Sequence, residues 1–302
     1  MGDSHKAQTG LACGVGAYTI WGLTPLLFNG IKSLGNVEIL ALRMLVSAAL
    51  LILLISFLRG WRSIGNIIRQ PRLLSALALS TVLIIANWLL FIMATRTGHV
   101  MESSLGFFIN PLFNVAFGMI FLGERLRAVQ WTAIVMAAGA VAFLGISQGT
   151  VPWMALTMAG TFSVYGLIRK IVPVSPFDGL AIENFIFVPF ATLILLIVPL
   201  SPPSSFTSSN IMLLALLAPA TVLPFFLFAA AAQRLQYSTV GVIQYIGPSL
   251  QFLVALHFGE AFDRAHAIAF GFIWTALAIY AVDSLRYHGY HVRNIRRREA
   301  VS

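Results

Sequence analysis

The chain has 302 residues, of which 59% are hydrophobic and only 10% are charged. So few charges exclude a soluble domain of this size, because such a domain exposes many polar groups to water. The net charge of +9 would suit a nucleic-acid partner, but the distribution of the charges, described below, excludes that class. The single cysteine, Cys13, excludes an internal disulfide.

Ten apolar stretches follow one another, each near the roughly 20 residues that a helix needs to cross a bilayer. Strands of a membrane barrel would instead alternate polar and apolar residues. The loops between the stretches are short and leave no room for a separate soluble domain. The sequence therefore predicts an all-α membrane protein with ten transmembrane helices. The stretches are 10–30, 37–58, 73–95, 101–122, 128–147, 151–170, 179–199, 211–232, 238–258 and 265–284.

Lysine and arginine fall mainly on one side of this predicted topology. With the first residues placed in the cytoplasm, 15 of the 19 basic residues lie in cytoplasmic segments and 3 lie outside. The remaining one, Arg43, lies within a span. Such a bias over short loops predicts a multi-pass protein with both termini in the cytoplasm.

A proline-containing apolar segment followed by Gly-Glu occurs twice in the chain. Pro111 precedes Gly123-Glu124, and Pro248 precedes Gly259-Glu260 at nearly the same spacing. Glycine is expected to end one helix, and glutamate to lie near the positive N-terminal end of the next helix. The repeat predicts that the two halves of the chain are related.

Further pairs align the halves in order, and their offset falls from 144 for Trp21 and Tyr165 to 140 for Arg43 and Glu183. The sequence therefore predicts two five-helix repeats, at 1–149 and 150–285, and a basic cytoplasmic tail at 286–302. Because five is an odd number, the second repeat must enter the membrane inverted. Inverted repeats are the architecture of carriers that open to each side in turn.

Arg43 and Glu183 are the sharpest candidates for a functional site. They occupy equivalent places in the two halves, inside predicted spans, where a charge costs about 2.5–3.5 kcal/mol unless it finds a partner. One interpretation is a structural ion pair between the halves or an approach to the membrane interface. The other is that they line the substrate path, with Glu183 as the proton-coupling residue.

Two prolines and several amides form a second candidate group. A proline inside a helix frees a backbone carbonyl, which needs a partner when it lies in a membrane. Amides nearby can serve packing between helices or line a central cavity, as can the aromatic and amide groups of neighbouring spans. The further candidates for the substrate path are Trp21, Asn87, Trp88, Asn110, Pro111, Asn114, Tyr165, Gln244, Tyr245, Pro248 and Gln251.

Longer motifs cover almost the whole chain. They are Asn87-Trp88-Leu-Leu-Phe91, Glu102-Ser-Ser-Leu-Gly-Phe-Phe-Ile-Asn110-Pro111-Leu, Ile120-Phe-Leu-Gly-Glu124-Arg125, Tyr165-Gly-Leu-Ile-Arg169-Lys170, Gln244-Tyr-Ile-Gly-Pro248 and Gly271-Phe-Ile-Trp274. Together they resemble RarD-type permeases of the EamA family, within the drug/metabolite transporter superfamily. The resemblance implies ten helices in two inverted repeats and a bacterial inner-membrane location. It also implies export or exchange of small organic solutes, such as metabolites or amphenicol drugs.

The predicted function is a secondary transporter for a small organic solute, working by alternating access, with proton coupling as one option. A non-transporting scaffold or sensor and a membrane-embedded enzyme are the alternatives. Gly145-Ile-Ser147-Gln-Gly149 matches a nucleophile motif but lacks its strand–turn–helix context, so no catalytic residue is assigned. No metal or other cofactor is expected. The expected partners are the solute and membrane lipid, without nucleic acid, and a homodimer is left open.

Overall fold

The computed structural model describes residues 2–29, 34–96, 100–147, 153–198, 201–257, 264, 267–269 and 271–283. Regular structure within these ranges is helical throughout. The main helices are α1 (Gly2–Asn29), α2 (Asn36–Leu54), α3 (Arg62–Ile68), α4 (Pro71–Arg96), α5 (Val100–Leu122), α6 (Ala128–Ser147), α7 (Trp153–Ile171), α8 (Pro176–Ile197), α9 (Ser208–Arg234), α10 (Tyr237–Gln244) and α11 (Ile246–His257). A π-helical turn, Ile55–Arg59, extends α2, and residues 267–269 and 271–283 are also helical.

Several helices are long and apolar enough to cross a membrane. Four segments meet this description by length and composition: one in α2 and its π-helical extension, and one each within α4, α8 and α9. Shorter apolar helices lie at Gly106–Leu122, Ala128–Phe143 and Ala267–Asp283. Large apolar side chains cover much of the outer surface; Phe57, Ile146 and Leu196 are 85%, 80% and 79% exposed. This surface suits lipid and not water, as an all-α multi-pass membrane protein requires.

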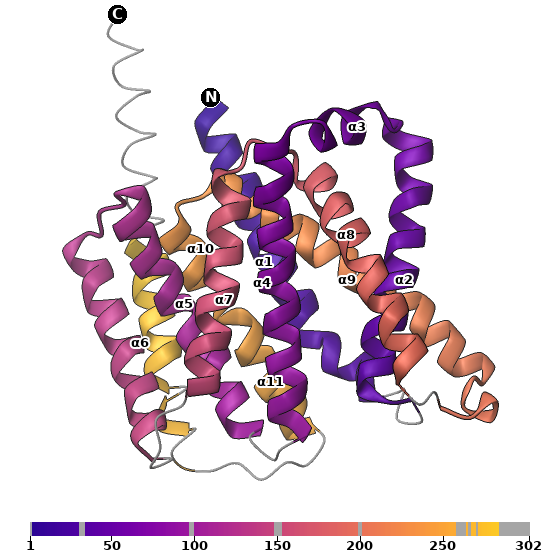
Figure 1. Ribbon diagram of the computed structural model, residues 1–302. Coiled ribbons are helices and arrows are strands. Elements are labelled where there is room, and N and C mark those ends of the chain that lie inside the picture. The colour runs from indigo at the N-terminus through magenta and orange to yellow at the C-terminus, as the bar shows by residue number, and fades with distance from the viewer. Residues whose placement is uncertain are drawn as a thin grey trace, which may run out of the picture.

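Helices far apart in the sequence pack side by side. α1 packs against α9, α2 against α8, α4 against α7, and α5 against both α7 and α10. α6 lies at one edge of the bundle and α2 at the opposite edge, while the start of α1 and α3 lie at the same end (Figure 1). The inner core is therefore built from helices of both halves of the chain.

Aromatic rings fill the centre of this core. Tyr165 of α7 stacks on Phe228 of α9 with centroids 6.0 Å apart, and Trp21 of α1 meets Phe225 edge to face at 5.0 Å. Such pairs add about 0.5–1.5 kcal/mol each to the burial of their area. Three helices that are distant in sequence are thereby joined at one place.

Within the described residues, the helix boundaries depart from the predicted spans in two places, and the short helix α3 lies between the second and third predicted spans. α1 begins at Gly2 and not near residue 10, so the polar first residues continue the helix. The predicted ninth span is broken at Tyr245 into α10 and α11. Pro248 explains the break, because it cannot donate to the carbonyl of Gln244 four residues earlier. Pro111, in contrast, lies inside the uninterrupted α5.

Glu124 joins the two halves of the chain. Gly123 ends the preceding helical segment with a φ of 64°, as its sequence position predicts. The Glu124 carboxylate accepts hydrogen bonds from the backbone N–H of Tyr237 at 2.5 Å and of Ser238 at 2.9 Å. Glu124 precedes α6 by four residues, as expected, but its carboxylate caps α10, 113 residues further on. Gly259-Glu260 lie outside the described residues.

Candidate functional site

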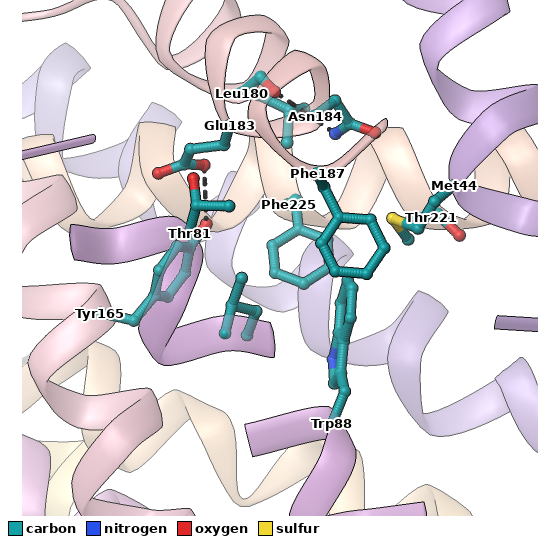
Figure 2. A pocket seen from close by; sticks show the side chains of 11 residues that line it. Met44, Thr81, Trp88, Tyr165, Leu180, Glu183, Asn184, Phe187, Thr221 and Phe225 are labelled. Carbon is teal, nitrogen blue, oxygen red and sulfur yellow. Dashed lines mark hydrogen bonds between the residues drawn. The ribbon is translucent and has the colours of Figure 1, made fainter. Parts of the chain in front are cut away.

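A small cavity lies between α2, α4, α7, α8 and α9 (Figure 2). Its volume is about 30 Å³. That is room for about two waters and far less than the roughly 300 Å³ of a small-molecule site. The lining residues are Met44, Thr81, Ile84, Trp88, Tyr165, Leu180, Glu183, Asn184, Phe187, Thr221 and Phe225.

Glu183 of α8 is the carboxylate of this cavity, and it is 5% exposed. Its Oε1 accepts a hydrogen bond from Ser80 Oγ of α4 at 2.5 Å, and its Oε2 accepts one from the Tyr165 hydroxyl of α7 at 3.4 Å. Arg169 Nη1 of α7 lies 3.7 Å from Oε1 and forms an ion pair. Three helices therefore converge on one carboxylate.

Arg169 is the largest side chain that is fully buried in the described structure, at 1% exposure. Its Nη2 donates to the carbonyl of Pro176 at 3.0 Å, at the start of α8. The guanidinium packs directly on the backbone of α8 at Gly179, where a Cβ would overlap it. Because Gly179 has no side chain, the Arg169 guanidinium of α7 can reach Glu183.

Arg43 of α2 does not line the cavity but contacts Trp88, which does. Its guanidinium carbon lies 4.5 Å from the centre of the Trp88 ring of α4, in cation–π contact. Trp88 in turn meets Phe187 and Phe225 edge to face, at 5.9 and 5.8 Å. The ion pair of Glu183 is thus made with Arg169, and Arg43 contacts an aromatic ring.

A second polar group, which we call the amide seam, lies where α5 meets α7 and α10. It consists of Asn110, Asn114, Ser163 and Gln244. Ser163 Oγ donates to Asn110 Oδ1 at 2.7 Å, and Asn114 Nδ2 donates to Gln244 Oε1 at 2.7 Å. The Tyr18 hydroxyl of α1 also approaches Gln244 Oε1, at 3.4 Å. These amides therefore join helices to one another.

The other candidates lie outside the cavity lining. Asn87 Nδ2 donates to the carbonyl of Met158 at 2.7 Å, which joins α4 to α7. Gln251 Nε2 reaches the carbonyl of Trp21 at 3.4 Å. The Tyr245 hydroxyl is buried and has no hydrogen-bond partner in the described part of the chain. Pro111 and Pro248 are both buried in the bundle, Pro111 beside α10 at Gly241.

Sequence reasoning misses several residues that line the cavity or contact Glu183. Arg169 adjoins Lys170 at the end of a predicted span, a position that is typical of a cytoplasmic charge. Ser80 and Thr81 lie in an apolar run that offers no periodic signal. Asn184 directly follows Glu183, and an amide beside a buried carboxylate is a signal that was available. Within the described ranges, no group of three His, Cys, Asp or Glu side chains could hold a metal ion.

Comparison with known proteins places the chain among transporters. The EamA-like transporter family matches residues 8–146. An "Uncharacterized transporter" of Vibrio cholerae is 41% identical over 288 residues, covering 94% of this chain and 95% of the relative. "Protein RarD" of Escherichia coli is 40% identical over 287 residues, covering 94% and 97%.

A solved crystal structure shares the fold, with a TM-score of 0.71 at 20% identity over 91% of this chain and 98% of the other. The relatives align with this chain over almost its whole length. The chain belongs to the EamA-like transporter family and is a RarD-type membrane permease of the drug/metabolite class.

Proposed function

We propose that the protein is a secondary transporter that moves a small organic solute, a metabolite or an amphenicol-type drug, across the bacterial inner membrane. The observation that carries the proposal is the position of the cavity. α2 and α4 of the first half and α7, α8 and α9 of the second half line it. A rocking motion between halves 1–149 and 150–285 changes its access to either side.

The packing of the helices supports two inverted five-helix repeats. Exchanging the halves replaces α1 by α7, α2 by α8, α4 by α9, and α5 by α10 with α11. The contact of α1 with α9 then becomes the contact of α7 with α4, and both exist. The contact of α5 with α7 likewise becomes that of α11 with α1, which also exists. The end of the family match at residue 146 supports a boundary near 149.

Two equivalent hydrogen bonds, which we call latches, support alternating access. Glu38 in the first turn of α2 accepts from Ser201 Oγ at 2.6 Å, before α9. Asp178 in the first turn of α8 accepts from Ser63 Oγ at 2.8 Å, in α3. Each latch joins the start of one helix to a connection in the other half. Inversion places the two latches at opposite membrane faces.

Inversion also explains why Arg43 and Glu183 have separate partners. Each lies seven residues after the start of its helix, Asn36 in α2 and Pro176 in α8. At 1.5 Å per residue, each is about 10 Å deep, but from opposite faces of a hydrocarbon core about 30 Å thick. The two charges therefore lie at different depths along the membrane normal.

The cytoplasmic face is the one that carries α3. Arg62, Arg69 and Arg72 lie in or beside α3, which is at the same end of the bundle as the start of α1 (Figure 1). The positive-inside rule assigns this end to the cytoplasm. The Asp178–Ser63 latch is then cytoplasmic and the Glu38–Ser201 latch periplasmic. The basic tail at 286–302 lies outside the described residues.

Flux into liposomes tests the proposed function. Purified protein is reconstituted and offered labelled solutes, including amphenicols and small metabolites, with and without an imposed pH gradient. Saturable flux that rises with the gradient supports a proton-coupled carrier, and Glu183→Gln is expected to remove the dependence on the gradient. Gradient dependence that survives in Glu183→Gln would remove Glu183 from the coupling. Flux equal to that of empty liposomes for every solute would favour a scaffold or sensor.

A further inference from the structure

The polar groups that line the cavity are mostly hydrogen-bond acceptors. Thr81 Oγ1 donates its proton to the carbonyl of Leu77 at 2.8 Å, and Thr221 Oγ1 donates to that of Leu217 at 2.7 Å. A hydroxyl has one proton, so both groups have only lone pairs left for a ligand. The two threonines therefore present acceptors from α4 and α9.

Asn184 adds an acceptor from α8. Its Nδ2 donates to the carbonyl of Leu180 at 3.3 Å, four residues earlier. A carbonyl can only accept, so this bond fixes the orientation of the amide and turns Oδ1 away from Leu180 (Figure 2). Oδ1 is buried and has no hydrogen-bond partner among the residues that the structure describes. A buried amide oxygen without a partner costs free energy unless a ligand or water satisfies it.

Glu183 supplies the strongest acceptor. A carboxylate has about four lone-pair positions. Its Oε1 receives Ser80 and Arg169, while Oε2 has only the Tyr165 hydroxyl, at the long distance of 3.4 Å. Because Tyr165 gives its proton to Glu183, its hydroxyl also brings only lone pairs to the cavity. Two hydrogen-bond donors remain among these lining groups: the second proton of the Asn184 amide and the indole N–H of Trp88.

The rest of the cavity is apolar and largely aromatic. Trp88 meets both Phe187 and Phe225 edge to face, and the three rings gather on one side of the space (Figure 2). Ring faces carry partial negative charge and attract cations, as the Arg43 guanidinium over the Trp88 ring illustrates. An anionic group placed in the cavity would meet acceptor lone pairs and ring faces, while the two nearby cations, Arg169 and Arg43, already contact Glu183 and Trp88.

We propose that the cargo carries a protonated primary amine attached to an apolar, ring-sized body. The ammonium group has three N–H donors, which match the oxygens of Glu183, Asn184 and the two threonines. Its apolar body packs on the aromatic rings. Arg169 offsets much of the charge of Glu183, so hydrogen bonding and not charge alone selects the amine. This inference rests on the proposed function, and it requires the cavity to widen when cargo enters.

Binding to the purified full-length protein in lipid nanodiscs tests the inference directly. The probe is radiolabelled 2-phenylethylamine, and the competitors are its N,N,N-trimethyl analogue, 2-phenylethanol and 3-phenylpropionate. The trimethyl analogue keeps the positive charge and ring but has no N–H donor. We expect 2-phenylethylamine to bind at least tenfold more tightly than each competitor. Equal or tighter binding of the trimethyl analogue or of the carboxylate would overturn the inference.

Variants locate the binding site within the molecule. Asn184→Leu removes the oxygen without a partner, and we expect about tenfold weaker binding of 2-phenylethylamine. Thr81→Val and Thr221→Val keep the side-chain volume, and each should weaken binding about threefold. Thr192→Val is the matched control, because Thr192 makes the same type of bond, to Val188, on the exposed face of α8. Unchanged amine binding in Asn184→Leu and in both valine variants would contradict the assignment.

The same protein in liposomes separates this inference from the proposed function. Selective amine binding without flux would contradict the proposed transport function but support the proposed amine site. Saturable flux of neutral or anionic solutes, with no preference for the amine in binding, would keep the transporter and overturn the inference. Each variant is first compared with wild type in monodispersity and thermal unfolding, so that loss of fold is recognised.

Discussion

The cavity and the amide seam contain similar residue types but use them differently. In the seam, Asn114 and Gln244 bond to each other across α5 and α10, and Ser163 bonds to Asn110 across α7 and α5. In the cavity, Thr81, Thr221 and Asn184 bond to carbonyls of their own helices. Side chains of the first kind hold helices together, although Asn114 Oδ1 also has no hydrogen-bond partner among the described residues. Side chains of the second kind leave acceptors available for another molecule.

This contrast shows that polar residue types in a membrane helix do not by themselves identify a binding site. A binding site is identified instead by the groups that accept the hydrogen bonds of these side-chain hydroxyls and amides. Groups that donate to another helix hold the two helices together, and their hydrogen bonds contribute about 0.6 kcal/mol each on average in a membrane. Groups that donate to their own backbone contribute little to packing and keep lone pairs directed elsewhere. Variants in the cavity and variants in the amide seam should therefore change different measured quantities.

The largest expected effect is on stability and comes from the ion pair beside the cavity. Arg169→Met leaves the Glu183 carboxylate buried without its cation, so we expect the free energy of unfolding to fall by about 3–5 kcal/mol. Denaturant unfolding of the purified protein in detergent measures it. The double variant Arg169→Met/Glu183→Gln should recover part of this loss, because no charge then remains unpaired. A single variant as stable as wild type would mean that the pair does not hold α7 against α8.

A smaller loss is expected from Gly179→Ala. The new methyl group overlaps the Arg169 guanidinium, and overpacking of this kind costs about 1–3 kcal/mol. The matched control is Gly139→Ala in α6, where a Cβ meets nothing within 4 Å. Thermal unfolding of the two variants should differ in sign, since alanine alone favours a helix by about 0.5–1 kcal/mol over glycine. Equal unfolding temperatures would contradict the close packing of Arg169 on α8.

The two latches are expected to have opposite effects on access to the cavity. Each serine-to-carboxylate bond contributes about 1 kcal/mol, or about a fivefold shift in population. Ser201→Ala should therefore speed labelling of a Thr221→Cys reporter by a membrane-impermeant maleimide from the periplasmic side. Ser63→Ala should slow it by a similar factor.

The measurement uses a Cys13→Ser background, because Cys13 is the only native cysteine. Ser75→Ala is the control, since Ser75 bonds to a carbonyl of its own helix and is exposed. If Ser63→Ala and Ser201→Ala change the labelling rate in the same direction, the latches do not act at opposite faces.

The smallest expected effect belongs to the amide seam. A double-mutant cycle of Asn114→Leu and Gln244→Leu should give a coupling energy of about 0.6 kcal/mol in thermal or denaturant unfolding. The relative flux of different solutes should stay the same, because neither side chain lines the cavity. A change in solute preference with unchanged stability would mean that the amide seam is part of the transport path.

The all-helical membrane fold was predictable from the sequence. Continuous apolar runs give the helices, and Pro248 explains the broken ninth span. The extent of α1 was not predictable, because its polar first residues carry no apolar pattern. The target of Glu124 was missed for a different reason: the helix that it caps begins 113 residues later, and only the tertiary packing brings the two together.

The candidate site was predicted only in part. Of the predicted residues, Trp88, Tyr165 and Glu183 line the cavity. They could be predicted because charged and aromatic groups stand out in apolar helices. Arg169 was missed because its place at the end of a span, beside Lys170, is typical of a cytoplasmic charge. The separation of cavity from seam could not be predicted either. It depends on which carbonyl each hydroxyl and amide reaches, and that is a property of rotamers and packing.

The most direct test of the account measures solute flux in liposomes for three variants side by side. Phe187→Leu and Glu183→Gln alter the cavity, and Asn114→Leu alters the seam with a change of similar size. The account predicts that saturable flux falls at least tenfold in both cavity variants and stays within about twofold of wild type in Asn114→Leu. Flux lost in Asn114→Leu and kept in both cavity variants would contradict the assignment of the cavity as the transport path.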